Sequence, residues 1–273
     1  MRIGPLPFHV TALLSIAMLA ACDAREADNE AVAQPAPVEA EPKASVLPLP
    51  APPLDRAALL GAVAAASSAH TAGSDDKAAQ AALDGRRFAI RLRFGCAGPA
   101  AEDSSEALRW SAKSDTSIEI TATPNLSLEA PALAGLDDET VEAVEGFWIS
   151  RPWLLSDACP AANAPATVPT TAATAAPEHS VGIAQYYGAG ESRVERRSGR
   201  AYVSVEPIEP DAAPPRDGFF LLLEGRLRPW PGGKPIRCTA TAAGQRPACV
   251  VSMRLDRAAF SRPDGEVIDE WAP

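Results

Sequence analysis

Residues that could do nucleophilic or acid–base chemistry are few in this chain. Ser74 stands three residues before Lys77, a spacing at which a serine can act as a nucleophile assisted by a lysine. His70 and His179 are the histidines that follow residue 22. A catalytic histidine must be held rigidly between nucleophile and acid, but His70 falls at a predicted helix end and His179 beside an Ala/Pro/Thr-rich segment. We therefore expect neither histidine to be catalytic.

The run Ser74-Asp75-Asp76-Lys77 resembles the nucleophile motif of penicillin-binding proteins and class A β-lactamases. Members of those families also carry K-T-G and Ser-Asp-Asn elements, and neither occurs in this sequence. A serine at this position is also typical of a helix N-cap, because its side-chain oxygen accepts a hydrogen bond from an amide of the first turn. We therefore predict that Ser74 caps a helix.

Carboxylates are abundant, with 35 Asp and Glu against 25 Lys and Arg and a formal net charge of −10. A pair of them held about 5–10 Å apart could hydrolyse a glycosidic bond, so a carboxylate-dependent hydrolase of envelope glycans is one alternative. The acidic balance argues against nucleic acid as a partner. Neither phosphate-binding loops nor metal-ligand spacings occur, and we predict no cofactor and no metal site.

Arginines offer a different chemistry. Arg87, Arg91 and Arg93 alternate with apolar residues, so they share one face of a predicted strand. Guanidinium groups bind phosphate and carboxylate in a bidentate geometry, and such a row could bind an anionic envelope polymer. The alternative is a solvated sheet face whose arginines pair with acids on neighbouring strands, such as Glu119 or Glu224.

An aromatic-rich segment, residues 146–155, contains Trp148, Arg151 and Trp153. Trp and Arg are typical anchors of protein interfaces, which favours a binding surface. A buried strand running into a corner near Cys159 explains the same residues, because Trp and Phe are usually buried. Both interpretations stay open at this stage.

The N-terminus resembles that of a bacterial lipoprotein. A short apolar run from Val10 to Ala21 is too short to span a bilayer but suits a signal peptide. It ends in Leu19-Ala20-Ala21-Cys22, which resembles a lipobox. The resemblance implies that residues 1–21 are removed and that Cys22 carries lipid. We therefore expect a membrane anchor on the periplasmic side of the cell envelope, in either the inner or the outer membrane.

The elements that position these residues follow from composition and periodicity. Residues 22–53 are rich in Pro and Glu and predict a disordered tether. Residues 54–84 predict short helices at Asp55–Ala66 and Asp75–Leu83. Residues 85–273 predict a β domain, interrupted by a flexible Ala/Pro/Thr-rich insert at 160–178. Ten strands are expected, at 87–93, 107–112, 117–123, 144–150, 180–187, 201–205, 218–228, 235–241, 249–256 and 266–271.

About ten short strands separated by turn dipeptides indicate a mainly β fold, an antiparallel sandwich or a barrel-like domain. The four cysteines besides Cys22 are even in number, which favours two disulfides in an oxidising compartment. Cys238 and Cys249 flank a predicted hairpin turn, so we pair these two and, by remainder, Cys96 with Cys159.

From the sequence we predict a lipid-anchored protein of the cell envelope with a non-catalytic binding or scaffolding role. Its expected partners are the membrane, through the N-terminal lipid, and an envelope protein or polymer. A glycan hydrolase and a module that inhibits or docks onto another protein are the alternatives.

Overall fold

The computed structural model describes residues 50–136, 140–159, 179–191, 196–209, 215, 217–240, 242 and 244–272. The predicted signal peptide, Cys22, the predicted tether up to residue 49 and the insert 160–178 lie outside these residues. The chain divides into two units, Met1–Leu49 and Pro50–Pro273. All the helices and strands that follow belong to the second unit.

Helix α1 spans Arg56–Ala72 and presents the predicted apolar face, with Leu59, Leu60 and Val63 buried. It begins at Asp55, whose carboxylate accepts a hydrogen bond from the amide of Ala58 at 2.8 Å. The helix runs six residues beyond the predicted end at Ala66. It stops only at Gly73, whose left-handed φ of 60° suits a residue without a side chain.

Helix α2 is shorter than expected, Lys77–Ala81, and the prediction that Ser74 caps it is wrong. Asp76 is the N-cap residue, and the carboxylate of Asp75 accepts the amide of Lys77 at 2.9 Å. The Ser74 hydroxyl instead donates to the carbonyl of Ala69, at the end of α1. Asp76 therefore occupies the N-cap position without a capping hydrogen bond from its side chain, and the carboxylate of Asp75 binds the first turn instead.

Strands form at all ten predicted places among the described residues, with ends that differ by a few residues. They are β1 (Arg87–Phe94), β2 (Leu108–Ser114), β3 (Ser117–Ala122), β4 (Val141–Trp148), β5 (Val181–Gly188), β6 (Tyr202–Pro207), β7 (Phe219–Leu227), β8 (Ile236–Thr239), β9 (Ala248–Ser261) and β10 (Val267–Trp271). A 3₁₀ turn, η1 (Pro131–Leu133), precedes β4. The mainly β fold class is confirmed.

The strands build two sheets. The larger has the order β1-β7-β9-β5-β4, with β8 and β10 also paired to the long strand β9, and the smaller has the order β2-β3-β6. Every pairing is antiparallel except that of β5 with β9. The larger sheet is therefore mixed rather than purely antiparallel, because the chain crosses to β6 in the smaller sheet before it returns through β7 and β8 to β9.

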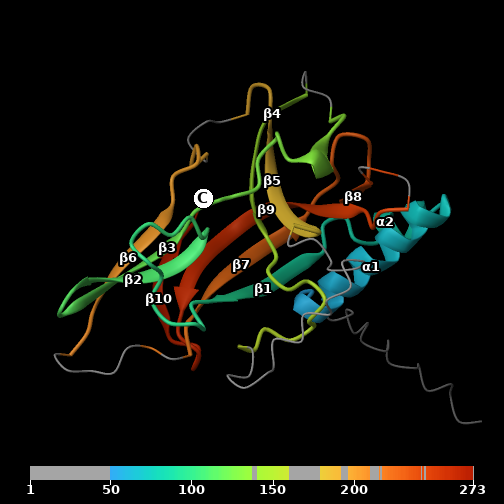
Figure 1. The fold of residues 1–273 in the computed structure, drawn as a ribbon. Helices are drawn as coiled ribbons and strands as arrows, with labels where there is room; N and C mark the ends of the chain where they lie inside the picture. The colour runs from blue at the N-terminus through green and yellow to red at the C-terminus, as the bar shows by residue number, and fades with distance from the viewer. Residues whose placement is uncertain are drawn as a thin grey trace, which may run out of the picture. The chain divides into compact units, whose positions relative to one another are not determined.

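A main core lies on one face of the larger sheet. It is formed by the buried side chains of β1, β7 and β9, by those of α1, and by Trp110 and its neighbours in the smaller sheet. Figure 1 shows the smaller sheet on the left and α1 on the right. A second, smaller core around Leu126, Leu133 and Trp230 covers part of the opposite face. The rest of that opposite face carries the arginines of β1.

Both predicted disulfides form. Cys238 and Cys249 face each other across the β8–β9 pair. Cys96, just after β1, is bonded to Cys159. The second bond ties the segment that follows β4 to the end of β1.

Candidate binding surface

Three arginines stand side by side on the outer face of the larger sheet, opposite the main core. Arg87 on β1 faces Arg226 on β7, and Arg226 in turn faces Arg254 on β9. Directly paired residues of antiparallel strands point to the same face, with Cβ atoms about 5 Å apart. All three side chains are exposed. We call this set the arginine row.

Among the described residues, the arginine row has no counterion. In the described part of the chain, no hydrogen bond or ion pair engages its three guanidinium groups. Glu224 is already bound to Arg257, with 3.2 Å between Oε2 and Nη1. Glu270 lies 2.7 Å from the same guanidinium, and its hydrogen bond, followed by that of Glu224, raises the pKa of Arg257. Like charges directly opposite one another destabilise a sheet, so the row favours an external anion.

The pairing proposed for the arginines with Glu119 or Glu224 is therefore wrong. Glu119 binds Lys113, its neighbour on β2, at 3.0 Å, and Glu224 binds Arg257 on β9. The register places Ala89 opposite Glu224 on β1 and Arg257 opposite it on β9, so Glu224 pairs with Arg257 rather than with an arginine of β1.

A second arginine group surrounds residues 150–155, which we call the Trp153 loop. Arg56, in the first turn of α1 and only 9 % exposed, donates hydrogen bonds to three carbonyls of this loop. The acceptors are Ser150 (2.8 Å), Arg151 (3.0 Å) and Leu154 (3.0 Å). The start of α1 therefore determines the path of the loop.

Positive charge accumulates where this loop meets β1. Arg91 and Arg93 stack over the ring of Phe220, with their Cζ atoms 3.7 and 4.8 Å from its centroid. Arg91 pairs with Asp157 at 3.5 Å. Arg93 donates twice to the carbonyl of Asp217, at 3.0 and 2.6 Å.

Nη1 of Arg151 is buried and has no hydrogen-bond partner, whereas the buried Nε of Arg91 lies 3.5 Å from Oδ2 of Asp157 in an ion pair. Burial lowers the pKa of Arg151, and the charge of Arg93 lowers that pKa further. Burial likewise lowers the pKa of Arg56, followed by the charge of Arg151, while Asp157 acts in the opposite direction. The positive charge where the loop meets β1 is therefore only partly neutralised by nearby acids, which suits an anionic ligand at this place.

One part of the aromatic segment is buried and another part is exposed, so each of the two interpretations holds for one part. Phe147 and Ile149 are buried in the main core, and Trp148 is half-buried, stacked on His179 with 5.1 Å between ring centroids. Trp153 is 54 % exposed and Leu155 is 61 % exposed. The strand portion is thus core, and the loop portion is surface.

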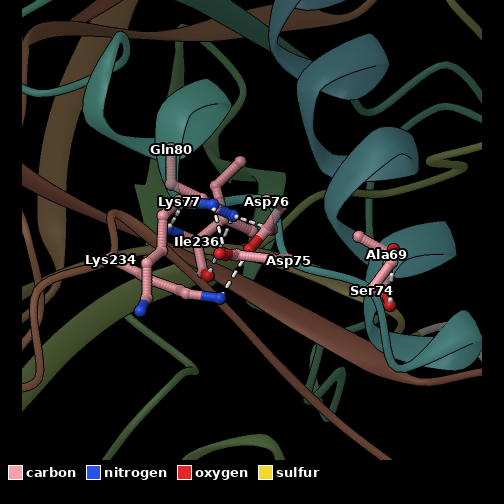
Figure 2. Close-up of polar contacts among 8 residues, drawn as sticks. All are labelled: Ala69, Ser74, Asp75, Asp76, Lys77, Gln80, Lys234 and Ile236. Atoms are coloured by element: carbon pink, nitrogen blue, oxygen red, sulfur yellow. Dashed lines mark hydrogen bonds and ion pairs between the residues drawn. The ribbon is translucent and has the colours of Figure 1, made fainter.

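The Ser74–Lys77 motif borders a cavity of about 360 Å³ between the end of α1 and residues 230–238. Figure 2 shows Ser74 next to Ala69, apart from Lys77. Asp76 accepts hydrogen bonds from Lys234 and Gln80, which hold the pKa of its carboxyl below the ordinary range. Gln80 also bonds both the amide and the carbonyl of Ile236. The polar groups here join α2 to β8, and the geometry does not activate the serine.

Sequence reasoning found one strand of this surface and missed the rest. Arg254 is not among the predicted site residues, although it interrupts the apolar run of β9. Arg56 carries no local signal, since an arginine in a first helical turn is usually solvated. Its role depends on a loop 94–98 residues away.

Neither described helix is long and apolar enough to cross a membrane. Comparison of the chain with protein-family models, with curated proteins and with solved structures finds no match.

Proposed function

We propose that this protein is a lipid-anchored component of the bacterial cell envelope, on its periplasmic side, that binds an anionic envelope partner without catalysis. The observation that carries this proposal is the arginine row, Arg87, Arg226 and Arg254 in cross-strand register with no counterion among the described residues. The partner is a polymer or a protein surface that presents phosphate or carboxylate groups.

The charge distribution supports a specific anion contact rather than general cation character. The whole chain has a formal net charge of −10, so it repels anions at long range. The arginine row instead places three positive charges side by side on the sheet. A fixed spacing of about 5 Å between neighbouring guanidinium-bearing strands suits a ligand with several anionic groups in sequence.

The membrane anchor in this proposal comes from the lipobox-like run that ends in Cys22. A signal peptide followed by a lipidated cysteine holds a protein at the membrane surface without a spanning helix. The folded unit then acts close to that surface, where anionic polymers and lipid headgroups are concentrated.

No observation favours the glycan hydrolase. A catalytic general acid needs a carboxyl group with a raised pKa. The hydrogen bonds that Asp76 and Glu129 accept lower the pKa of each of these carboxyl groups. The arginine row therefore supports a binding role, and no feature of the described residues supports the hydrolase.

The test uses a chain that starts at residue 22 with Cys22→Ser, which keeps the whole compact unit Pro50–Pro273 without the lipid. The probe is inorganic polyphosphate, and its dissociation constant is measured at several salt concentrations. We expect the triple variant Arg87→Gln/Arg226→Gln/Arg254→Gln to bind at least about tenfold more weakly, with a shallower salt dependence.

A charge-matched control removes three arginines outside the row, Arg109→Gln/Arg200→Gln/Arg246→Gln. Because this control has the same net charge as the triple variant, it should keep affinity within about twofold if the row is the site. Equal losses in both triple variants, or no polyphosphate binding by the parent chain, would overturn the proposal.

A further inference from the structure

The chain joins the folded unit beside the arginines. Leu54 donates its amide to the carbonyl of Arg87 at 2.8 Å and accepts the amide of Ala89 at 2.9 Å, so it is bound alongside β1. Arg56, two residues later, bonds the carbonyls of the Trp153 loop. The point at which the upstream chain arrives therefore lies next to both β1 and the loop.

The Trp153 loop exposes three consecutive apolar side chains. Trp153 is 54 % exposed, Leu154 38 % and Leu155 61 %. The other large exposed apolar residues in the described part of the chain are separate valines on strands: Val203, Val205 and Val267. A tryptophan with adjacent leucines is typical of side chains that enter the interfacial layer of a membrane.

Cationic groups lie close to this loop. Arg151 belongs to it, and Arg91 pairs with Asp157, two residues after it, at 3.5 Å. Among the described residues, no ion pair engages Arg93 or Arg151. The side chain of Arg91 is 39 % exposed, and one guanidinium nitrogen of Arg151, Nη1, has no hydrogen-bond partner. A phosphate oxygen accepts hydrogen bonds from the accessible nitrogens of such guanidinium groups, and an anionic surface offers many phosphates at the depth of the headgroups.

We propose that the Trp153 loop docks the folded unit onto an anionic lipid surface. Trp153, Leu154 and Leu155 enter the interfacial layer, and headgroup phosphates accept hydrogen bonds from Arg91, Arg93 and Arg151. The inference rests on the proposed function, because the lipid on Cys22 is what keeps the loop near a membrane. The 28 residues from Cys22 to Leu49 can span at most about 100 Å, so the anchor permits this contact.

A soluble anion would account for the arginines but not for the exposed apolar side chains of the Trp153 loop. Free phosphate would neutralise the arginines, but it makes no use of the three exposed apolar side chains of the loop. A lipid surface accounts for both, because it presents phosphate and hydrocarbon at adjacent depths.

The experiment measures sedimentation of the residue 22–273 chain with Cys22→Ser against two kinds of vesicle. One is pure phosphatidylcholine, and the other contains about 30 % phosphatidylglycerol. We expect binding to the anionic vesicles, weakened about fivefold by Arg151→Gln and at least about tenfold by Trp153→Ser/Leu155→Ser. Since both apolar residues are largely exposed, the double variant should keep the thermal midpoint of the parent.

The matched control is Val203→Ser/Val205→Ser, which removes two other exposed apolar side chains, 43 % and 45 % exposed, from β6. Its vesicle binding should stay within twofold of the parent chain. Equal losses in the loop variant and this control would overturn the inference, as would a parent chain that stays in the supernatant with anionic vesicles.

Polyphosphate binding separates this inference from the proposed function. Trp153→Ser/Leu155→Ser should bind polyphosphate as the parent does, because the arginine row is intact. If the parent binds polyphosphate but not anionic vesicles, the membrane inference fails and the proposed function stands. If the parent binds neither probe, both are wrong.

Discussion

Single residues in this protein form contacts that cross long stretches of sequence. Asp76 accepts hydrogen bonds from Gln80, one turn away, and from Lys234, 158 residues away. Gln80 continues the connection to the backbone of Ile236. The motif that resembles a serine nucleophile thus contributes to stability, by fastening the short helix α2 to the start of β8.

Asp76→Asn should lower the free energy of unfolding by about 1 kcal/mol at pH 7. The folded pKa of Asp76 is depressed, below the unfolded value of about 3.9. Its ionised carboxylate therefore stabilises the fold fully above about pH 4, and this contribution is lost as the pH falls through the folded pKa. Urea unfolding of both proteins at pH 7 and at about pH 2.5 measures the difference.

The control for this prediction is Lys234→Gln, alone and combined with Asp76→Asn. The two substitutions should be less than additive at pH 7, because they remove the same ion pair. A difference between parent and Asp76→Asn that is equal at both pH values would show that the carboxylate charge is not what stabilises the contact.

At the scale of elements, the alternation of apolar and polar residues predicted the strands well. Phe88, Ile90 and Leu92 face the main core, as their period of two requires. The helix ends were predicted less well, since several Asp and Ser residues before α2 could each serve as its cap. Which one does so depends on Lys234 and Ile236, which no local pattern includes.

The Cys96–Cys159 bond links two elements that are distant in sequence, the end of β1 and the segment after β4. Its removal in Cys96→Ala/Cys159→Ala should lower the free energy of unfolding by about 4 kcal/mol, because the bond closes a loop with a sequence separation of 63 residues. Equilibrium unfolding in urea without reductant provides the measurement.

For comparison, Cys238→Ala/Cys249→Ala opens a loop with a separation of only 11 residues and should cost about 3 kcal/mol. A loss below about 1 kcal/mol in the Cys96/Cys159 variant would mean that the neighbouring contacts, such as Arg91 with Asp157, already hold the segment in place.

On the scale of the whole molecule, the proposal combines an anchor, a connecting segment and a folded unit. Intact mass of protein extracted from membranes tests the anchor and the disulfides together. We expect a chain that starts at Cys22 and carries lipid, with no thiol available to alkylation until reduction and four thiols afterwards. An unlipidated chain with free thiols would contradict both the anchor and the envelope location.

The candidate surface shows where sequence reasoning ends. Alternation placed Arg87, Arg91 and Arg93 on one face of a strand, because side-chain direction in a strand depends on position within that strand alone. It could not find the arginine row, since the positions of Arg226 and Arg254 beside Arg87 depend on the order and register of three strands.

The sequence by itself determined the type and approximate position of nearly every element, because helix and strand periodicity and turn chemistry are local properties. It also determined the pairing of Cys238 with Cys249, which flank one hairpin. Only the tertiary structure decided which strands are neighbours, which acids neutralise which bases, and that Trp153 is exposed while Trp148 packs on His179. Those outcomes depend on long-range packing and register, which sum contributions from the whole chain.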